Sequence, residues 1–423
     1  MINEPTIQYI ESHATDDVAQ LALHPSKDPQ VDMAAALQQI AGRQKAKEKL
    51  PDWYATEGIL YPKKVSMEQC SSSQTADYKA SIVQGESFAD LSGGFGVDTI
   101  ALARKFGKGY YVEPQEELCA LFQHNSKVFG ISNITVINNT LENSIGALEP
   151  VDVIYLDPSR RDVHGRRVVS LEECVPNLLE WKDRLLAKCN TLMVKLSPMI
   201  DLHRTLRSLP ETVAVHVVAV NGECKEVVCL LTQNPSDNGI SGDARPCVST
   251  PGTNVPDTLI VAVDIFNKTS DVPCGDKRLC VSTTMETERT APLSIASELG
   301  AYLYEPDVAV MKAGIFNAIS RQFQVQKLEK GTNLFTSDGL REDFPGRVFR
   351  IGAVHEFHPR KLARELSAIE SASIAVRNFP LSAEELRKTL KIKDGNACYL
   401  FGCTLSDGRR VVIETQKACP RLG

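Results

Sequence analysis

The feature that most constrains this chain of 423 residues is a glycine-rich segment, Phe88-Ala89-Asp90-Leu91-Ser92-Gly93-Gly94-Phe95-Gly96-Val97-Asp98-Thr99. A short apolar run that ends in glycines and continues into Ile100–Ala103 predicts a strand, a tight turn and a helix. Glycines let a ligand approach the backbone, and a helix N-terminus presents unpaired N–H groups. We expect Asp98 or Thr99 to cap this helix. The segment therefore predicts a ligand site in an α/β fold.

An acidic residue follows at the spacing found in nucleotide-binding folds. Glu113 ends the next apolar run, where such folds place a carboxylate that accepts the ribose hydroxyls. A dinucleotide fingerprint has a further glycine where this chain has Thr99. Asp90 would repel a phosphate but suits the ammonium group of an amino acid. The predicted ligand is therefore a nucleoside joined to an amino acid, as in S-adenosylmethionine (SAM).

These residues resemble the first motif of class I SAM-dependent methyltransferases, which reads roughly D-L-x-x-G-x-G. The resemblance implies that Asp90 holds the methionine part, that Gly94 and Gly96 line its passage, and that Glu113 binds the ribose. We also place Ser92 among the cofactor-binding residues. By their position after the third strand, the residues expected to contact the adenine are Asn138, Asn139 and Thr140.

Alternating apolar segments predict a Rossmann-like core. We expect strands near 87–91, 109–113, 133–138, 151–156 and 190–197, and helices near 98–106, 115–127 and 172–188. This alternation predicts a parallel sheet with right-handed crossovers. Segments 212–220 and 226–232 predict a closing antiparallel hairpin, so the methyltransferase domain is expected to span residues 83–233.

Other parts flank this core. Residues 1–82 have helical periodicity and predict an N-terminal helical region. Its last helix has a Ser-rich start, so Gln69, Ser71 and Lys79 either lie near the cofactor or belong to a plain helix cap. Residues 234–257 are rich in Pro, Gly and Ser and predict a linker. Beyond it we expect α+β modules, which makes the overall fold class α/β with C-terminal α+β modules.

The order of these parts resembles a bacterial methyltransferase family in which the core is followed by a ferredoxin-like domain and a THUMP-like domain. The segments that carry the resemblance are Glu68–Ser72, Asp157–Asp162 and Tyr304–Gly314. It implies a ferredoxin-like domain at 257–343 and a THUMP-like domain at 345–423. THUMP domains are associated with RNA modification enzymes, so the C-terminal modules are expected, by analogy, to bind RNA.

The end of the fourth strand is the predicted reaction site, because reacting groups in open α/β sheets lie beyond the carboxyl ends of the strands. It continues as Asp157-Pro158-Ser159-Arg160, which resembles the (D/N)-P-P-(Y/F) motif of enzymes that methylate exocyclic amines of bases. The resemblance implies that Asp157 and Pro158 orient the amine. We add Lys195 of the fifth strand as a neighbour. The alternative is that Asp157 only caps a turn.

Two departures from related motifs bear on the reaction. Ser159 and Arg160 replace the second proline and the aromatic residue, so any stacking on a base falls to a guanidinium plane. A D-P-P-R motif occurs in uridine C5 methyltransferases, but these need a cysteine nucleophile at the end of the fifth strand. Met193–Pro198 contains no cysteine. We therefore exclude the C5 mechanism.

A run of arginines follows the predicted reaction site. Arg160, Arg161, Arg166 and Arg167 lie within eight residues around a central glycine. Arginine binds phosphate bidentately, so this loop is predicted to contact substrate phosphates. The alternative is a solvated loop paired with nearby acids.

Composition narrows the class of protein. The net charge is −6, but residues 301–423 carry 19 Lys and Arg against 14 Asp and Glu, so phosphate contacts are expected in this basic third. The 12 cysteines include no C-x-x-C pair, which indicates reduced thiols and no metal site. No long apolar run or signal peptide is evident, so we expect a cytoplasmic protein without membrane contact.

The sequence as a whole predicts a SAM-dependent methyltransferase that acts on RNA. A base nitrogen of tRNA or rRNA is the expected methyl acceptor, and the C-terminal modules are expected to hold the RNA. Two alternatives stay open. One is methylation of a small molecule or protein, which the overall acidic charge favours. The other is an adaptor that binds SAM or RNA without turnover.

Overall fold

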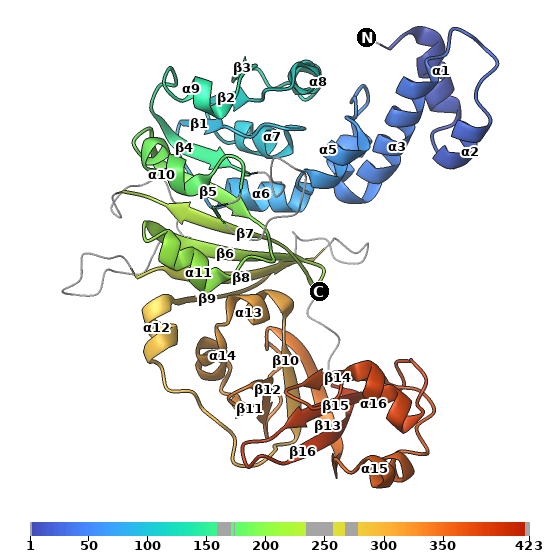
Figure 1. Cartoon of the computed structure of the whole chain (residues 1–423), viewed down its shortest axis with the longest axis vertical. Coiled ribbons are helices and arrows are strands. Elements are labelled where there is room, and N and C mark those ends of the chain that lie inside the picture. Colours follow the sequence, from blue (N-terminus) through green and yellow to red (C-terminus); the bar gives the residue numbers. More distant parts are fainter. Residues whose placement is uncertain (1, 159–170, 173, 234–256, 267–277, 419–423) are drawn as a thin grey trace. The chain divides into compact units, whose positions relative to one another are not determined.

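The computed structural model describes residues 2–158, 171–172, 174–233, 257–266 and 278–418 (Figure 1). The chain divides into two compact units. One comprises Met1–Ala214 and Val227–Arg245, and the other comprises Val215–Glu226 and Pro246–Gly423. The first unit holds the glycine-rich segment, and the second holds the C-terminal modules.

Six helices precede the glycine-rich segment, as the periodicity of residues 1–82 predicts. They are α1 (Glu4–Ser12), α2 (Val18–Leu23), α3 (Met33–Lys49), α4 (Pro51–Ala55), α5 (Lys64–Gln69) and α6 (Ser73–Ser81). Helices α1 and α2 pack against α3 (Figure 1). The buried ring of Trp53 in α4 lies 4.6 Å from the ring of Phe95 in the glycine-rich turn and 4.9 Å from that of Phe129. These aromatic contacts attach the helical region to the turn.

Five parallel strands form the centre of the first unit, which confirms the predicted Rossmann-like core. They are β1 (Ser87–Asp90), β2 (Lys108–Val112), β3 (Ile134–Ile137), β4 (Val151–Leu156) and β5 (Cys189–Leu196), in the order β3-β2-β1-β4-β5. The helices between them are α7 (Val97–Ala103), α8 (Glu116–Val128), α9 (Leu141–Ser144) and α10 (Leu178–Leu186). The strand order reverses between β1 and β4, where open α/β sheets bind ligands.

Antiparallel strands continue this sheet after α11 (Leu202–Ser208). The predicted strands of the closing hairpin are β6 (Thr212–Val220) and β7 (Glu223–Leu231), joined by Asn221 and Gly222 with φ values of 52° and 78°. Positive φ at both positions is typical of a type I′ turn. Strand β7 pairs antiparallel with β5.

The sheet includes two strands that the sequence analysis assigned elsewhere. The full order is β3-β2-β1-β4-β5-β7-β6-β8-β9, with β8 (Leu259–Ile265) and β9 (Arg278–Thr284). Both strands fall within residues 257–343, which the sequence predicts as the ferredoxin-like module, and the start of that module at residue 257 stays a prediction. The apolar run of β8, buried throughout, indicates a strand but does not identify the strands beside it.

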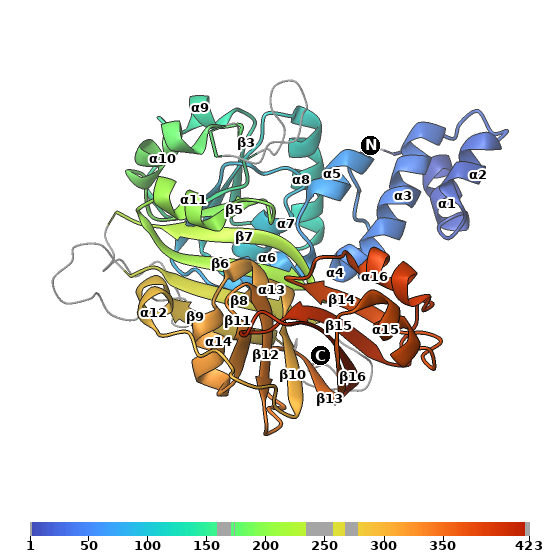
Figure 2. The same ribbon diagram turned by 60° about the horizontal axis from the view of Figure 1, so that its bottom comes forward.

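A second sheet contains the C-terminal modules (Figure 2). Its order is β11-β12-β10-β13-β16-β15-β14. The strands are β10 (Tyr302–Pro306), β11 (Gln326–Glu329), β12 (Thr332–Ser337), β13 (Gly346–Glu356), β14 (Ser373–Arg377), β15 (Tyr399–Thr404) and β16 (Arg410–Lys417). The helices of this region are α12 (Met285–Thr290), α13 (Val308–Ala313), α14 (Phe316–Phe323), α15 (Pro359–Glu365) and α16 (Ala383–Leu390). Because β13 pairs with both β10 and β16, the modules predicted on either side of residue 344 share one sheet.

The second sheet curls until its two ends meet. Thr332 Oγ1 at the start of β12 donates to the carbonyl oxygen of Thr404 at the end of β15 (2.7 Å). Arg377 of the edge strand β14 reaches Glu305 of β10 (2.8 Å). The core inside the curl contains residues from both predicted modules, among them Leu303, Leu334, Phe349, Phe401 and Ile413.

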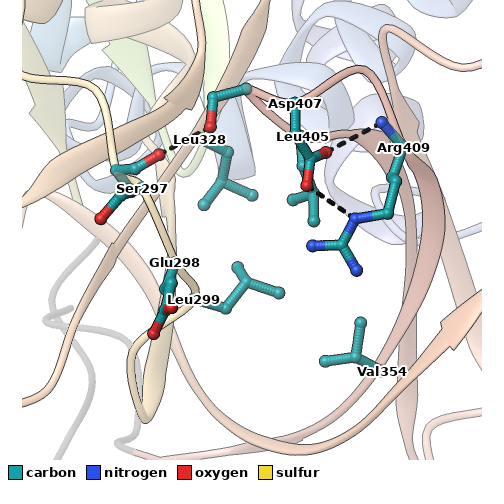
Figure 3. Close-up of a pocket in the computed structure, with 10 residues that line it drawn as sticks. Ser297, Glu298, Leu299, Leu328, Val354, Leu405, Asp407 and Arg409 are labelled. Carbon is teal, nitrogen blue, oxygen red and sulfur yellow. Dashed lines mark hydrogen bonds and ion pairs between the residues drawn. The ribbon is translucent and has the colours of Figure 1, made fainter.

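A cavity of about 270 Å³ lies beside this core (Figure 3). Leu299, Leu328 and Leu405 form its apolar lining, and Arg409 at its edge donates through Nε to Asp407 (2.6 Å). Its volume falls below the range of roughly 300–1,000 Å³ typical of small-molecule pockets. None of the predicted cofactor or catalytic residues lines it, so the cavity does not mark the predicted site.

We expect Gly346→Ala to destabilise the second unit by about 1–3 kcal/mol, because the added Cβ would lie 2.1 Å from the carbonyl oxygen of Glu305 across the β10–β13 pair. The control is Gly352→Ala on the same strand, where the nearest atom is 3.5 Å away and a change within about 0.5 kcal/mol is expected. Urea unfolding followed by circular dichroism measures both. Equal stability of the two variants would contradict the shared strand.

Candidate functional site

The glycine-rich turn leaves one backbone position open to a ligand. Gly94 has φ +54°, and a Cβ built there would meet only the carbonyl oxygen of Ser92, at 3.7 Å. The turn is fixed from below, because Tyr111 Oη donates to the carbonyl oxygen of Gly94 (2.7 Å). The turn therefore forms a cradle into which a ligand can approach the backbone.

The glycine at 96 serves packing rather than an open passage. A Cβ there would lie 2.3 Å from the ring of Phe122, which stacks on Tyr111 with ring centroids 4.0 Å apart. The sequence analysis placed both Gly94 and Gly96 along the methionine part of the cofactor. Of the two, only Gly94 has open space on its side-chain face, and a cofactor contact at Gly96 stays a prediction.

Asp90 is buried at the end of β1 and organises the turn. Its Oδ1 accepts hydrogen bonds from Ser92 N (2.9 Å) and Ser92 Oγ (3.2 Å), and its Oδ2 accepts one from Thr99 Oγ1 (2.6 Å). Burial raises the pKa of Asp90 to about 7, although the bonds from Thr99 and Ser92 favour the ionised form. A nearby cation such as a ligand ammonium would stabilise the carboxylate.

Glu113 follows β2 and lies beside the open glycine. Its Oε2 accepts a hydrogen bond from Gly94 N (2.9 Å) and its Oε1 accepts one from Gln115 N (3.0 Å). The side chain is nearly buried, so both oxygens are held in place. A fixed carboxylate next to the partly exposed backbone of Gly94 fits a ribose with two hydroxyl donors. The residues present therefore fit a nucleoside ligand such as SAM.

The residues predicted to contact adenine form hydrogen bonds within the loop after β3 and to the segment after β2. Asn138 Nδ2 donates to the carbonyl oxygen of Glu113 (2.9 Å), and Asn139 Oδ1 accepts from Thr140 N (2.9 Å). Thr140 caps α9 by accepting from Asn143 N (3.4 Å). These bonds fix the loop after β3 beside Glu113, and the adenine contact itself stays a prediction.

The predicted reaction site adjoins the cofactor turn directly. Asp157 follows β4, and its backbone N–H donates to Ser92 Oγ (2.8 Å). Pro158 is buried behind it. The Asp157 carboxylate forms an ion pair through Oδ2 with the ammonium group of Lys195 on β5. The structure thus brings together Asp90, Ser92, Asp157 and Lys195, which the sequence analysis proposed from separate strand ends.

A buried polar network continues behind Lys195. Lys195 Nζ donates to Ser71 Oγ (3.4 Å), and Lys79 Nζ donates to the same oxygen (3.1 Å). Ser71 in turn donates to Asp98 Oδ2 (2.7 Å), which also accepts from Tyr155 Oη (2.9 Å). Lys79 completes the network as an ion pair with Asp98 Oδ1 (3.1 Å).

Two members of this network correct or extend the sequence analysis. We expected Asp98 or Thr99 to cap α7, and this was wrong, because the N-cap is Gly96 and has no side-chain cap. Thr99 bonds to Asp90 instead, and Asp98 pairs with Lys79. Burial opposes ionisation of Asp98, but Lys79 and then Lys195 outweigh it and lower its pKa. Tyr155 was missed because a tyrosine within an apolar strand gives no sign of a polar partner.

The predicted arginine loop, a metal site and a membrane-spanning helix remain to be considered. Arg160, Arg161, Arg166 and Arg167 fall outside the described residues. Within the described ranges, no group of three or more His, Cys, Asp or Glu side chains is arranged to hold a metal ion. No helix in the described part of the chain has the length and hydropathy required to cross a membrane.

Two family models match the C-terminal part of the chain. A ferredoxin-like domain matches residues 302–345, and a domain described as THUMP domain-like matches residues 346–417. Their boundary coincides with the start of β13. No curated protein matches the chain at a significant level.

Solved structures match at two levels of similarity. The crystal structure of a candidate methyltransferase from Porphyromonas gingivalis W83 is 30% identical, covers 99% of this chain and 100% of its own, and superposes with a TM-score of 0.83. An rRNA methylase from Streptococcus thermophilus is 18% identical and covers 38% of this chain and 95% of its own, with a TM-score of 0.30. A candidate methyltransferase from Streptococcus mutans in complex with SAH is 13% identical and covers 37% and 94%, also with a TM-score of 0.30.

The parallel sheet, the glycine turn at its switch point and the acid after β2 define a class I methyltransferase core. The full-length similarity to the Porphyromonas gingivalis protein and the two C-terminal domain matches narrow this class to one family. The chain belongs to the bacterial class I methyltransferase family with a ferredoxin-like domain and a C-terminal THUMP-like domain.

Asp90 gives the protein a specific pH dependence. Its pKa is about 7 in the folded chain and near 3.8 when unfolded, so between these values the folded state holds a proton that the unfolded state has lost. Stability therefore falls as the pH rises through this window. From pH 5 to pH 8 we expect wild type to lose about 2–3 kcal/mol relative to Asp90→Asn, which lacks this ionisation. Urea unfolding at both pH values measures the difference, and a constant difference would contradict the buried, protonated Asp90.

Proposed function

We propose that this protein transfers a methyl group from SAM to a base nitrogen of RNA, in tRNA or rRNA. The observation that carries the proposal is Asp157, whose backbone N–H joins the cofactor turn through Ser92 Oγ and whose carboxylate is held through Oδ2 by Lys195. Its Oδ1 accepts no hydrogen bond from the described residues, and the side chain is 28% exposed. One oxygen is thus fixed and the other is available to a substrate amine.

The cofactor half of the proposal rests on family membership and on the fit of the turn. Glu113 would bind the ribose hydroxyls, the backbone at Gly94 would face the ligand, and Asp90 would attract its ammonium group. Asp90 is buried and bonded within the turn, so its effect on the ligand would act mainly through its charge and through the shape of the turn. When bound, SAM supplies a methyl group activated by a sulfonium.

The substrate half rests on the chemistry at Asp157. Its free oxygen would accept a hydrogen bond from an amino group and turn the nitrogen lone pair toward the methyl group. After transfer the nitrogen must lose one proton, and the same oxygen would receive it before it passes to solvent. Lys195 would keep the carboxylate oriented throughout.

The RNA assignment rests on the C-terminal part. The THUMP domain-like match covers residues 346–417, and residues 301–423 carry a net positive charge within an acidic protein. The S. thermophilus neighbour is described as an rRNA methylase, but its similarity is too low to support a substrate. The C-terminal modules are therefore proposed to hold the RNA, and Arg160, Arg161, Arg166 and Arg167 to contact its phosphates.

A second candidate function is methylation of a small molecule or a protein. It is favoured by the overall charge of −6 and by Ser159 and Arg160, which stand where base-amine methyltransferases have a proline and an aromatic residue. This candidate predicts no salt-dependent RNA binding. An adaptor that binds SAM or RNA without turnover is the third reading, and it predicts cofactor binding with no labelled product.

The decisive experiment measures tritium transfer from labelled SAM into RNA from a strain that lacks this gene. We expect label in a discrete RNA species that wild-type RNA does not yield, and at least a 100-fold lower rate with Asp157→Asn, because the variant loses the carboxylate acceptor. Cell lysate treated with ribonuclease is the parallel substrate. Label in protein or small molecules alone would overturn the RNA assignment, and no label in any fraction would favour the adaptor.

The cofactor site is tested separately by calorimetry with SAM. Glu113→Ala is expected to weaken binding by more than tenfold, a loss of at least ~1.4 kcal/mol for a charged hydrogen-bond acceptor. Asp157→Asn serves as the matched control, because its side chain lies on the substrate side and SAM affinity should stay within about twofold. Unchanged affinity in the Glu113 variant would reject the ribose assignment.

A further inference from the structure

Two buried ammonium groups in the first unit share one hydroxyl oxygen. Ser71 lies in the short connection between α5 and α6, and its Oγ accepts hydrogen bonds from Lys79 (3.1 Å) and from Lys195 (3.4 Å). The only proton of this hydroxyl is donated to Asp98 (2.7 Å). The two ammonium groups are thus linked through a single oxygen atom, although one lysine comes from α6 and the other from β5.

Among the described residues, each ammonium group forms an ion pair with a different carboxylate. Lys79 pairs with Asp98, and Lys195 pairs with Asp157. The exposed fraction of the side chain is 1% for Lys79 and 3% for Lys195. It is 12% for Asp98 and 28% for Asp157. Charges this far from water interact strongly, so the removal of one partner must redistribute the others.

Asp98 is the carboxylate for which Lys195 would otherwise compete. It is connected to Lys195 through a single hydroxyl, and both lysines stabilise its ionised form. If Lys79 were neutral, Asp98 would be a buried anion without its own cation. Lys195 would then be drawn across Ser71 toward Asp98 and away from Asp157.

We propose that Lys79 is a positioning residue for methyl transfer: by neutralising Asp98 it leaves Lys195 paired with Asp157, and so holds the free oxygen of Asp157 in place for the substrate. This inference rests on the proposed function, because it concerns the residue that would orient the methyl acceptor. In this proposal Lys79 has no direct contact with substrate or cofactor, and its effect on Asp157 passes through Asp98, Ser71 and Lys195.

Other charged and titratable groups surround the network and enter its balance. Lys49 of α3 donates to the carbonyl oxygens of Met67 and Glu68 (both 2.9 Å) and lies near both Cys70 and Lys195. Asp90 of β1 lies near Asp98 and repels its negative charge when ionised, and burial raises the pKa of Asp90 to about 7. Neither group provides Asp98 with a second ion pair, so Lys79 is its counter-ion within the described residues.

The test compares the single variant Lys79→Met with the double variant Lys79→Met/Asp98→Asn. The single variant leaves the anion at Asp98, so Lys195 is expected to move and the rate of label transfer to fall at least tenfold, with SAM affinity within about twofold of wild type. The double variant removes the competing anion, and its rate is expected to return to within about threefold of wild type. A merely structural role predicts that the double variant is as impaired as the single one or worse.

A second measurement follows Lys195 itself and needs no methyl acceptor. Nuclear magnetic resonance of 15N-labelled lysine ammonium groups detects those protected from water, and Lys195→Arg assigns the signal. We expect this signal to shift in Lys79→Met and to return in the double variant. The matched control is Lys64→Met on α5, whose side chain is 85% exposed and pairs only with Glu68 at 3.9 Å, and this change should alter neither readout.

The two measurements separate the inference from the proposed function. An unchanged Lys195 signal in Lys79→Met, or a double variant no more active than the single one, would overturn the positioning role. If the Lys195 signal behaves as expected but wild type transfers no label to any substrate, the electrostatic arrangement stands and the proposed methyl transfer fails.

Discussion

One hydroxyl group joins the two halves of the candidate site. Ser92 Oγ accepts the backbone N–H of Asp157 and donates to Asp90 Oδ1, so the glycine turn and the end of β4 are tied within two hydrogen bonds. Pairing between the strands reinforces the tie, because Leu91 N donates to the carbonyl oxygen of Tyr155 (3.1 Å). If a ligand binds the turn and a substrate binds at Asp157, as proposed, the separation between them would be fixed by rigid elements, as a transfer reaction requires.

Behind this tie lie two buried lysine side chains and two partly buried aspartate side chains, and removing these charges from water is costly. Buried ion pairs contribute little net stability, because desolvation offsets their attraction, and an apolar cluster of the same volume would often be as stable. Three of the four, Lys79, Asp98 and Lys195, are held around a single serine, which makes their arrangement highly directional. Orientation of Asp157 explains the network better than a gain in stability does, because an apolar cluster would pack against Asp157 without orienting its carboxylate.

The sequence predicts the parts of the site that depend on position along the chain, and misses those that depend on tertiary pairing. Asp90, Glu113 and Asp157 were predicted because each ends or directly follows a strand, and parallel strands bring their carboxyl ends to one edge of the sheet. The role of Asp98 was mistaken because it stands in the first turn of a helix, where a cap is the ordinary local partner. Its actual partner is Lys79 of α6. The sequence predicts only that Lys79 lies near the cofactor or belongs to a helix cap, and gives no sign of a pair with Asp98.

The same distinction explains the C-terminal modules. Their mixed α+β composition was predicted from local pattern, but nothing local shows that β13 pairs with strands of both modules. The ferredoxin-like match of residues 302–345 contributes three strands, and Leu303 and Leu334 from it pack with Phe349, Phe401 and Ile413 from the THUMP domain-like match. A segment this short cannot bury a sufficient core alone. The two matches therefore form one folding unit, and a substitution in either one must be judged by its effect on both.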